Sequence, residues 1–240
     1  LGEIKVNKNE AYLVSYQLLG MVFVIVSLVA AIHIKKSSIR VILYLFSFIS
    51  LFLNGARSEI IGFFIGMVVI ESALNSQPKK IFLALFLPLQ LYAVFILATI
   101  FNPESRILAL FSKDRDGSVD ERSILFEKGI DHINNNPIFG NFGSYEPGEY
   151  IHNVFSAWVD LGLLGFIIYL FILIVPFAQV VVRVLLEKQK SLELILALSF
   201  LTISLILVMF AKNYTYLLLP VGLGIYSNYM AKNFKKSVSP

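Results

Sequence analysis

Residues 120–165 read DERSILFEKGIDHINNNPIFGNFGSYEPGEYIHNVFSAWVDLGLLG. This stretch begins in the one long polar segment of a very apolar chain and ends within an apolar run of membrane-span length. It contains Arg122, a Pro-x-x-Gly turn from Pro137 to Gly140, and the pair His152–Asn153 just before the apolar run. Because most of the remaining chain is apolar, we expect it to hold this stretch at one face of a membrane.

The composition excludes an ordinary soluble domain. The chain has 240 residues, of which 57% are hydrophobic and only 15% charged, whereas a soluble domain carries about a quarter charged residues. Uninterrupted apolar runs of about twenty residues predict membrane-spanning helices, and therefore an all-α polytopic bundle. The net charge of +4 does not indicate nucleic acid, because the cations flank the predicted spans. The chain has no cysteine, which excludes disulfides and thiolate chemistry.

We predict about seven spans. Residues 1–101 would hold four, residues 102–150 would form an extracytoplasmic catalytic loop with short helices, and residues 151–240 would hold three spans and a basic cytoplasmic tail. The spans are expected at residues 12–32, 41–53, 60–74, 81–101, 154–182, 194–211 and 216–230. Ser58 is expected to cap the third span, and Gly62 and Gly66 suit it to close helix contact. The polar start without Met leads us to expect a C-terminal portion of a longer membrane protein.

The short loops predict the orientation of the chain. Most of their cations fall on one side of the membrane, at Lys35, Lys36, Arg40, Lys79, Lys80, Arg183, Lys188, Lys190 and the tail lysines. That side is expected to be cytoplasmic, which places the long loop, Arg57 and Lys212 outside. The centres of the predicted spans carry no charged residue, whereas transporters usually need ionisable groups near the midplane. A site at the outer interface is therefore favoured over a path across the bilayer.

The long loop contains a predicted amphipathic helix. Asp120 is a suitable N-cap for a helix over 121–134, which Asn134-Asn135-Asn136-Pro137 would end. Arg122 shares an apolar stripe of this helix with three residues at helical spacing, Phe126, Ile130 and Ile133. An arginine in such a stripe either snorkels or binds an anion. The alternative is that Arg122 is a solvated loop charge without a specific role.

His152 and Asn153 open the next predicted span. Asn153 can cap that helix, whose positive N-terminal end suits a phosphate group. If the helix includes His152, then His152, Ser156 and Asp160 share one face. Asp160 needs a partner inside a membrane helix, and a histidine beside a carboxylate suits general-base catalysis. The alternatives are a capping or interfacial role for His152 and structural pairing for Asp160.

The order of these elements resembles the O-antigen ligase and polymerase superfamily. The resemblance covers about residues 50–165. It rests on Arg57 in an outward turn, Arg122, the sequence NPIFGNFGSY, the His152–Asn153 pair, and the final Gly-Leu-Leu-Gly. It implies a multi-pass glycosyltransferase of the bacterial cytoplasmic (inner) membrane. Such enzymes transfer undecaprenyl-diphosphate-linked saccharide at the outer face, in the biosynthesis of O-antigen, lipopolysaccharide, capsule or exopolysaccharide.

The resemblance also implies roles for individual residues. Arg57 and Arg122 would hold the diphosphate, and His152 would be the base or the group that orients the acceptor. Asp160, from its position relative to His152 rather than from the resemblance, is a further candidate catalytic residue that would orient the histidine. Residues expected to contribute to substrate binding are Asn153, Gly140, Gly143, Tyr145 and Lys212. No metal or cofactor is implied. The expected partners are the lipid-linked glycan donor, a glycan or lipid-linked acceptor, membrane lipid and a chain-length regulator, but no nucleic acid.

Alternatives remain open at the sequence level. A polymerase is slightly preferred over a ligase, although both share these motifs. Arg57 alone could be a snorkelling interfacial anchor, and Lys212 and Arg106 are outward cations without a matching motif. A different class, an exporter of polysaccharide or lipid-linked sugar, would require polar residues at the midplane and a solvated path between the spans.

Overall fold

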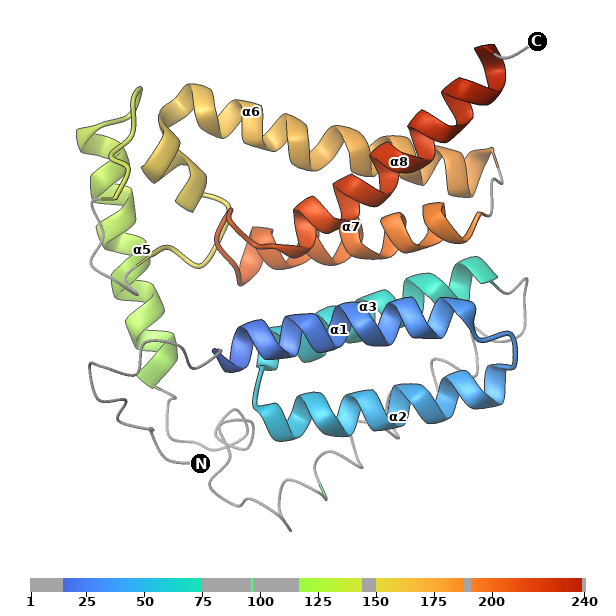
Figure 1. Cartoon of the computed structure of the whole chain (residues 1–240). Helices are drawn as coiled ribbons and strands as arrows, with labels where there is room; N and C mark the ends of the chain where they lie inside the picture. Colours follow the sequence, from blue (N-terminus) through green and yellow to red (C-terminus); the bar gives the residue numbers. More distant parts are fainter. Residues whose placement is uncertain (1–14, 75–95, 97–116, 144–149, 188–190, 239–240) are drawn as a thin grey trace, which may run out of the picture.

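The fold is an all-α bundle with one helix lying across its end, seen in a computed structural model that describes residues 15–74, 96, 117–143, 150–187 and 191–238 (Figure 1). Every regular element among these residues is helical. The helices are α1 (Tyr16–His33), α2 (Ser37–Asn54), α3 (Arg57–Leu74), α5 (Gly117–Asn135), α6 (Ser156–Val181), α7 (Leu192–Phe210) and α8 (Leu218–Val238), and a π-helical turn, η2 (Val182–Leu186), continues α6.

Helices α1, α2 and α3 form an antiparallel group joined by short turns (Figure 1). The Ser15 hydroxyl accepts from the Leu18 amide and caps α1. Helix α2 ends at Asn54 with Gly55 in the left-handed conformation. The expectation that Ser58 caps the third helix is wrong, because α3 already begins at Arg57. The Ser58 hydroxyl instead donates to the Glu59 carboxylate at 2.7 Å.

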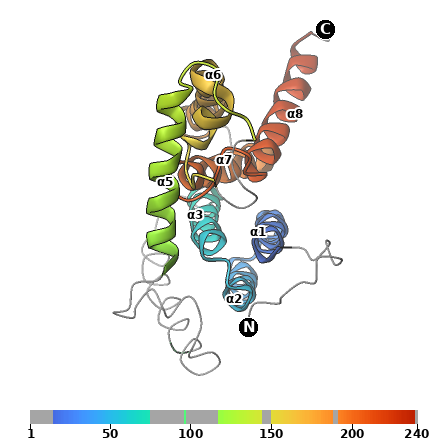
Figure 2. The ribbon, with the colours of Figure 1, turned by 90° about the vertical axis from the view of Figure 1, so that its left-hand side faces the viewer.

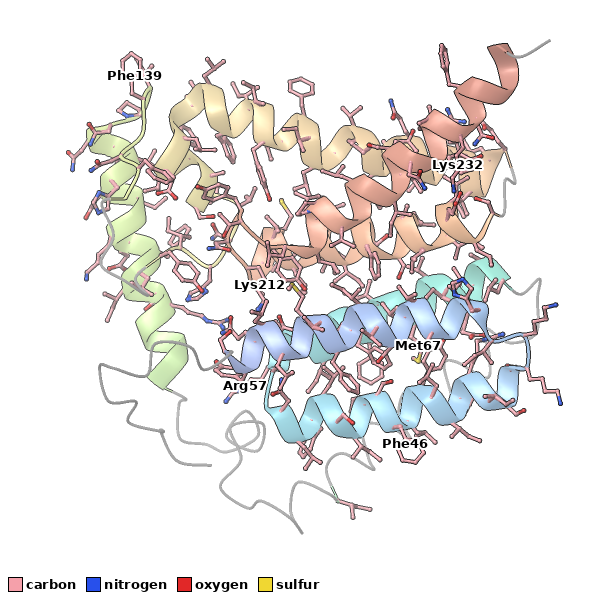
Figure 3. All side chains as sticks on the ribbon, viewed as in Figure 1. Phe46, Arg57, Met67, Phe139, Lys212 and Lys232 are labelled. Atoms are coloured by element: carbon pink, nitrogen blue, oxygen red, sulfur yellow. The ribbon has the colours of Figure 1, made fainter. Side chains whose placement is uncertain are left out.

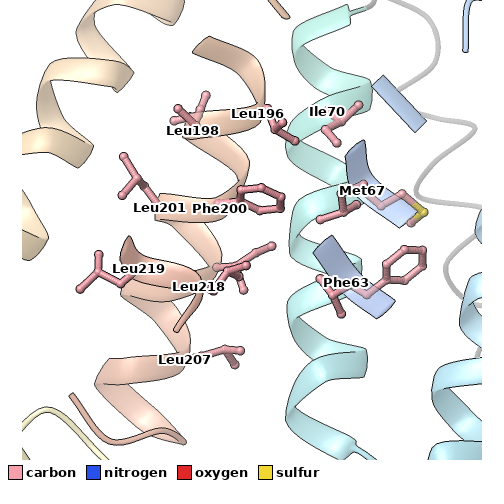
Figure 4. Close-up of a cluster of buried hydrophobic side chains, with 14 of the residues drawn as sticks. Phe63, Met67, Ile70, Leu196, Leu198, Phe200, Leu201, Leu207, Leu218 and Leu219 are labelled. Carbon is pink, nitrogen blue, oxygen red and sulfur yellow. The ribbon is translucent and has the colours of Figure 1, made fainter. Parts of the chain in front are cut away.

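The centre of the bundle is the contact of α3 with α7. At Gly62 and Gly66 an added Cβ would lie 2.9 Å from Ile203. This confirms the close contact predicted for the two glycines. The surrounding core is apolar (Figure 4), with labelled side chains from α3, α7 and the start of α8 at Phe63, Met67, Ile70, Leu196, Leu198, Phe200, Leu201, Leu207, Leu218 and Leu219.

Helix α5 lies across one end of the bundle, beside the start of α6 (Figure 2). It begins at Gly117, so the expectation that Asp120 caps it is wrong, because Asp120 lies inside the helix. It ends at Asn135, one residue beyond the predicted end and within the Asn134–Pro137 stretch expected to end it. The predicted stripe is confirmed. Ile133 packs with Ile151 and Val159 in a small core, and the rings of Phe126 and Phe155 meet edge to face at a centroid distance of 6.4 Å. We call this end of the molecule the α5 end.

Among the described residues, four helices are long and apolar enough to cross a membrane: Tyr16–His33, Ser37–Asn54, Ser156–Leu186 and Leu192–Phe210. Helices α3 and α8 occupy the third and seventh predicted spans. The predicted span at residues 81–101 lies outside the described residues, apart from Ile96. The span count of seven therefore stays a prediction.

The opposite end of the bundle contains a buried ion pair. Arg40 donates two hydrogen bonds to Glu71, at 2.5 and 2.9 Å, and the Tyr44 hydroxyl donates to the same carboxylate at 3.0 Å. Arg40 is only 3% exposed. It was predicted as a loop cation, but Glu71 neutralises it within the helix group.

Candidate functional site

The loop before α6 carries His152 at the α5 end. Its neighbours Ile151 and Val154 are buried, at 1% and 5% exposure, and anchor the loop on either side of the half-buried histidine. The ring of Tyr150 lies 4.5 Å from the His152 ring, centroid to centroid. The loop therefore presents an imidazole and a phenol side by side.

Hydrogen bonds fix this loop to the start of α6 and to the α7–α8 turn. The Asn153 carboxamide accepts from the Phe155 amide at 2.9 Å. The expectation that Asn153 caps this helix is wrong, because the N-cap of α6 is Phe155 and no side chain bonds there. The Ser156 hydroxyl donates to the Asn153 carbonyl at 2.7 Å and accepts from the Tyr214 amide at 2.9 Å. Asn153 and Ser156 thus hold His152 against two separate segments.

His152 and Asp160 do not share a helical face. Helix α6 begins at Ser156, so His152 lies outside it and the condition for the shared face is not met. The partner that Asp160 needs is Tyr214, whose hydroxyl donates to its carboxylate. Burial and the Asp160 charge raise the pKa of Tyr214 to about 12. Asp160 therefore acts on the α7–α8 turn, while its predicted role toward His152 stays a prediction.

Electrostatics connect His152 to cations from two other elements. Burial, the positive charge of Arg122 on α5 and that of Lys212 after α7 together lower the pKa of His152 from 6.5 to about 4. Burial raises the pKa of Tyr150, which the Arg122 charge opposes. His152 is therefore neutral at physiological pH, in the state that can accept a proton. A protonated His152 would add a further positive charge beside two cations.

Lys212 is held in a buried ion pair at the same end. Its ammonium lies 2.7 Å from the Glu59 carboxylate and 5.6 Å from the centre of the Tyr216 ring. It also donates a long hydrogen bond, 3.4 Å, to Gln17. Glu59 is 1% exposed and Lys212 8%. The pair joins the first turn of α3 to the α7–α8 turn, and Glu59 compensates much of the Lys212 charge.

Arg57, predicted to act with these groups, is the first residue of α3 and is half-buried. Figure 3 places it at the α5 end, on the same side of the bundle as Lys212. Arg122 is exposed on α5, which lies across this end. The structure thus brings Arg57, Arg122, His152 and Lys212 to one end of the bundle from four different segments.

Gly140 and Gly143, which were predicted to contribute to substrate binding, belong to a turn that packs on α6. Gly140 and Gly143 both have positive φ, at 69° and 74°. An added Cβ at Gly140 would lie 2.4 Å from the Gly162 nitrogen, while nothing lies within 4 Å of one at Gly143. Gly140 therefore serves a backbone contact with α6, and Gly143 is exposed. Tyr145 lies outside the described residues.

Sequence reasoning assigned no site role to Glu59, Tyr150 or Tyr214. Glu59 lies in the first turn of an apolar helix, where an acid signals that a buried partner exists. Tyr150, two residues before His152, has no spacing signal of its own. Among the described residues, no group of three His, Cys, Asp or Glu side chains could hold a metal ion.

Apolar helices of membrane-span length, with a histidine, tyrosines and cations gathered at one end, define a helical membrane protein with a candidate anion-binding site. Residues 42–170, more than half of the chain, match the family described as O-antigen ligase. The chain belongs to this family of membrane glycosyltransferases. No curated protein and no solved structure matches it.

Proposed function

We propose that the protein transfers or polymerises undecaprenyl-diphosphate-linked saccharide at the outer face of the bacterial cytoplasmic membrane, with the site at the α5 end. The observation that carries this proposal is the arrival of His152, Arg57, Arg122 and Lys212 at one end of the bundle from four segments, with Arg122 and Lys212 close enough to act electrostatically on His152. The resemblance of the motifs supports the donor class. We retain the slight preference for a polymerase over a ligase.

The proposed reaction needs few groups because diphosphate is a good leaving group. The acceptor hydroxyl oxygen attacks C1 of the donor sugar, the bond between C1 and the phosphate oxygen breaks, and undecaprenyl diphosphate leaves. His152 takes the proton of the acceptor hydroxyl. Arg57 and Arg122 stabilise the charge that develops on the diphosphate. Lys212, paired with Glu59, adds to the positive potential without being the main contact.

Donor binding would also prepare the base. Arg122 and Lys212 lower the pKa of His152 in the free protein; of these, Arg122 would face the diphosphate and Lys212 would add to the positive potential around it. The anion would offset their charge, so the pKa of His152 would rise on binding and the imidazole would become a stronger base. The site would thus be activated by its own substrate.

The placement of buried charges supports transfer over export. In the described part of the chain, the buried charged residues lie at the two ends of the bundle, as Arg40–Glu71 and Glu59–Lys212. Between them, the buried polar side chains are single hydroxyls such as Ser199 and Ser204. An exporter needs polar groups along a path across the bilayer.

A reconstituted assay tests the proposal. The full-length protein in proteoliposomes, given the lipid-linked saccharide donor, is expected to release undecaprenyl diphosphate and form a new glycosidic bond. Longer glycan on the same lipid would identify a polymerase, and glycan on a second lipid acceptor a ligase. Movement of intact donor across the bilayer without bond cleavage would contradict the proposal and favour the exporter.

The acid limb of the pH profile of kcat/KM is expected to reflect the pKa of His152. Because only the neutral imidazole accepts a proton, kcat/KM, which reflects the free enzyme, should fall only as pH approaches about 4. In Arg122→Gln one cation is lost, the protonated imidazole becomes less unfavourable, and the pKa rises. The acid limb of the variant should therefore move to higher pH. Identical acid limbs in the two proteins would contradict the electrostatic coupling.

A further inference from the structure

The turn over residues 137–143 exposes three large apolar side chains. Ile138 is 61% exposed, Phe139 89% and Phe142 77%. Figure 3 shows Phe139 at the outer edge of the molecule, far from Arg57 and Lys212. The turn contains no charged residue. Exposing a phenylalanine to water instead of burying it costs about 1.5–3 kcal/mol. Contact with an apolar phase would therefore stabilise this surface.

The exposure is imposed by a fixed backbone. The Asn141 amide donates to the Val159 carbonyl at 2.7 Å, and the Leu163 amide contacts the carbonyls of Pro137 and Ile138 at 3.0 and 3.2 Å. The Trp158 indole donates to the Pro137 carbonyl at 2.9 Å. These bonds replace helix bonds that α6 loses at its break, where Gly162 has φ 70° and ψ −177°. The turn is therefore a rigid part of the helix start.

The position of this break along α6 sets the depth of the turn. The first turns of α6 run at a steep angle to the rest of the helix (Figure 1). Residues 162–186 rise about 1.5 Å each and extend over about 37 Å, whereas the hydrocarbon core is about 30 Å thick. The Gly162 corner, and with it the turn, would lie at the boundary between hydrocarbon and headgroups.

The neighbouring surface has the composition of a membrane interface. Beyond the corner, α6 exposes a continuous run of apolar side chains that includes Leu164 at 68% and Phe171 at 63%. Beside the corner the ring of Phe166 stacks on Phe155 and on Trp158, at centroid distances of 5.9 and 5.2 Å. Of these rings, the Trp158 indole is of the kind that concentrates at membrane boundaries. The exposed turn thus continues a lipid-facing surface.

We propose that the turn is a membrane wedge. Ile138, Phe139 and Phe142 insert among the lipids at the boundary of the leaflet at the α5 end, about 5–10 Å below the headgroup surface. The partner is bulk bilayer lipid, because the patch is uncharged, projects outward, and adjoins the lipid-facing side of a membrane helix. The wedge holds the C-terminal end of α5 at the membrane surface. This inference does not depend on the proposed transfer reaction.

Single cysteines provide the test, since these 240 residues contain none. A nitroxide label is attached at Phe139→Cys or Phe142→Cys in the full-length protein, reconstituted into phosphatidylethanolamine–phosphatidylglycerol vesicles. Power-saturation EPR then compares collisions with oxygen, which concentrates in lipid, and with a water-soluble nickel complex. Controls are Asn135→Cys, exposed at the polar end of α5, and Phe171→Cys, exposed on α6.

Labels at 139 and 142 are expected to show a nickel-to-oxygen accessibility ratio several-fold below that at 135 and approaching that at 171. A ratio equal to that at 135 would place the turn in water and overturn the wedge. Low accessibility to both reagents with an immobilised spectrum would show that protein covers the turn, and would equally overturn it. Trp158 fluorescence matching that of the native protein verifies the fold of each variant.

Discussion

Replacing His152 with alanine is expected to abolish long glycan chains while leaving the protein in the membrane. A positioned general base contributes about 10²–10⁴-fold to a rate. The proposal gives this role to His152, since the nearby carboxylates of Glu59 and Asp160 are paired with Lys212 and Tyr214. The loop itself should persist, because buried Ile151 and Val154 and the Asn153 hydrogen bonds hold it. The measurements are the glycan ladder in cells and the transfer rate in proteoliposomes.

The arginine variants separate binding from proton transfer. Arg57→Ala and Arg122→Ala are also expected to abolish long chains, with residual activity that shows both a raised KM for the donor and a lower kcat, whereas His152→Ala lowers kcat with little change in KM. His33→Ala is the matched control, because His33 is exposed at the opposite end of the bundle. Normal ladders in Arg57→Ala, Arg122→Ala and His152→Ala together would refute the assignment of the site.

The sequence predicted what periodicity and composition control. The apolar stripe of Phe126, Ile130 and Ile133 does pack against the start of α6, and Gly62 does make a close helix contact. These features follow from residues a few positions apart on one helix, which a one-dimensional pattern can report. The family was also predicted from motif order, and the match over residues 42–170 confirms it.

What the sequence could not predict are pairings between distant segments. Asp160 was expected on the same helical face as His152, because the two residues are separated by two steps of four residues. Helix α6 begins only at Ser156, however, and Asp160 instead bonds to Tyr214 from the distant α7–α8 turn. In the same way Lys212 meets Glu59 across about 150 positions of chain. No local pattern encodes such a contact. Only the cost of an acid inside a membrane helix indicated that Asp160 would have a partner.

The most sensitive backbone position is expected to be Gly162. Its φ of 70° and ψ of −177° fall in a region that is essentially restricted to glycine. An added Cβ would lie 2.1 Å from the Ile138 carbonyl oxygen, a backbone atom that no rotamer change can move. Gly162→Ala would therefore have to separate the turn over residues 137–143 from α6. We expect a loss of more than about 4 kcal/mol, a range that few single substitutions reach, or failure to fold.

Substitutions at two other glycines separate the cost of the positive φ from the cost of the steric clash. Gly143 has nearly the same φ, 74°, but open space around an added Cβ, so Gly143→Ala should cost only the conformational strain of about 1–3 kcal/mol. Gly224 lies in α8 with open space and ordinary φ, so Gly224→Ala should gain up to about 1 kcal/mol of helix propensity.

Thermal unfolding in detergent measures the stability of all three variants. It is followed by the fluorescence of the single tryptophan, Trp158, whose indole is bonded to Pro137 in the turn. If Gly162→Ala and Gly143→Ala unfold at the same temperature, the close approach contributes nothing and the turn is not fixed by α6. If Gly162→Ala alone is unstable, the break in α6 is required for the backbone contact with the turn over residues 137–143. This requirement would explain why a glycine interrupts a membrane helix at this point.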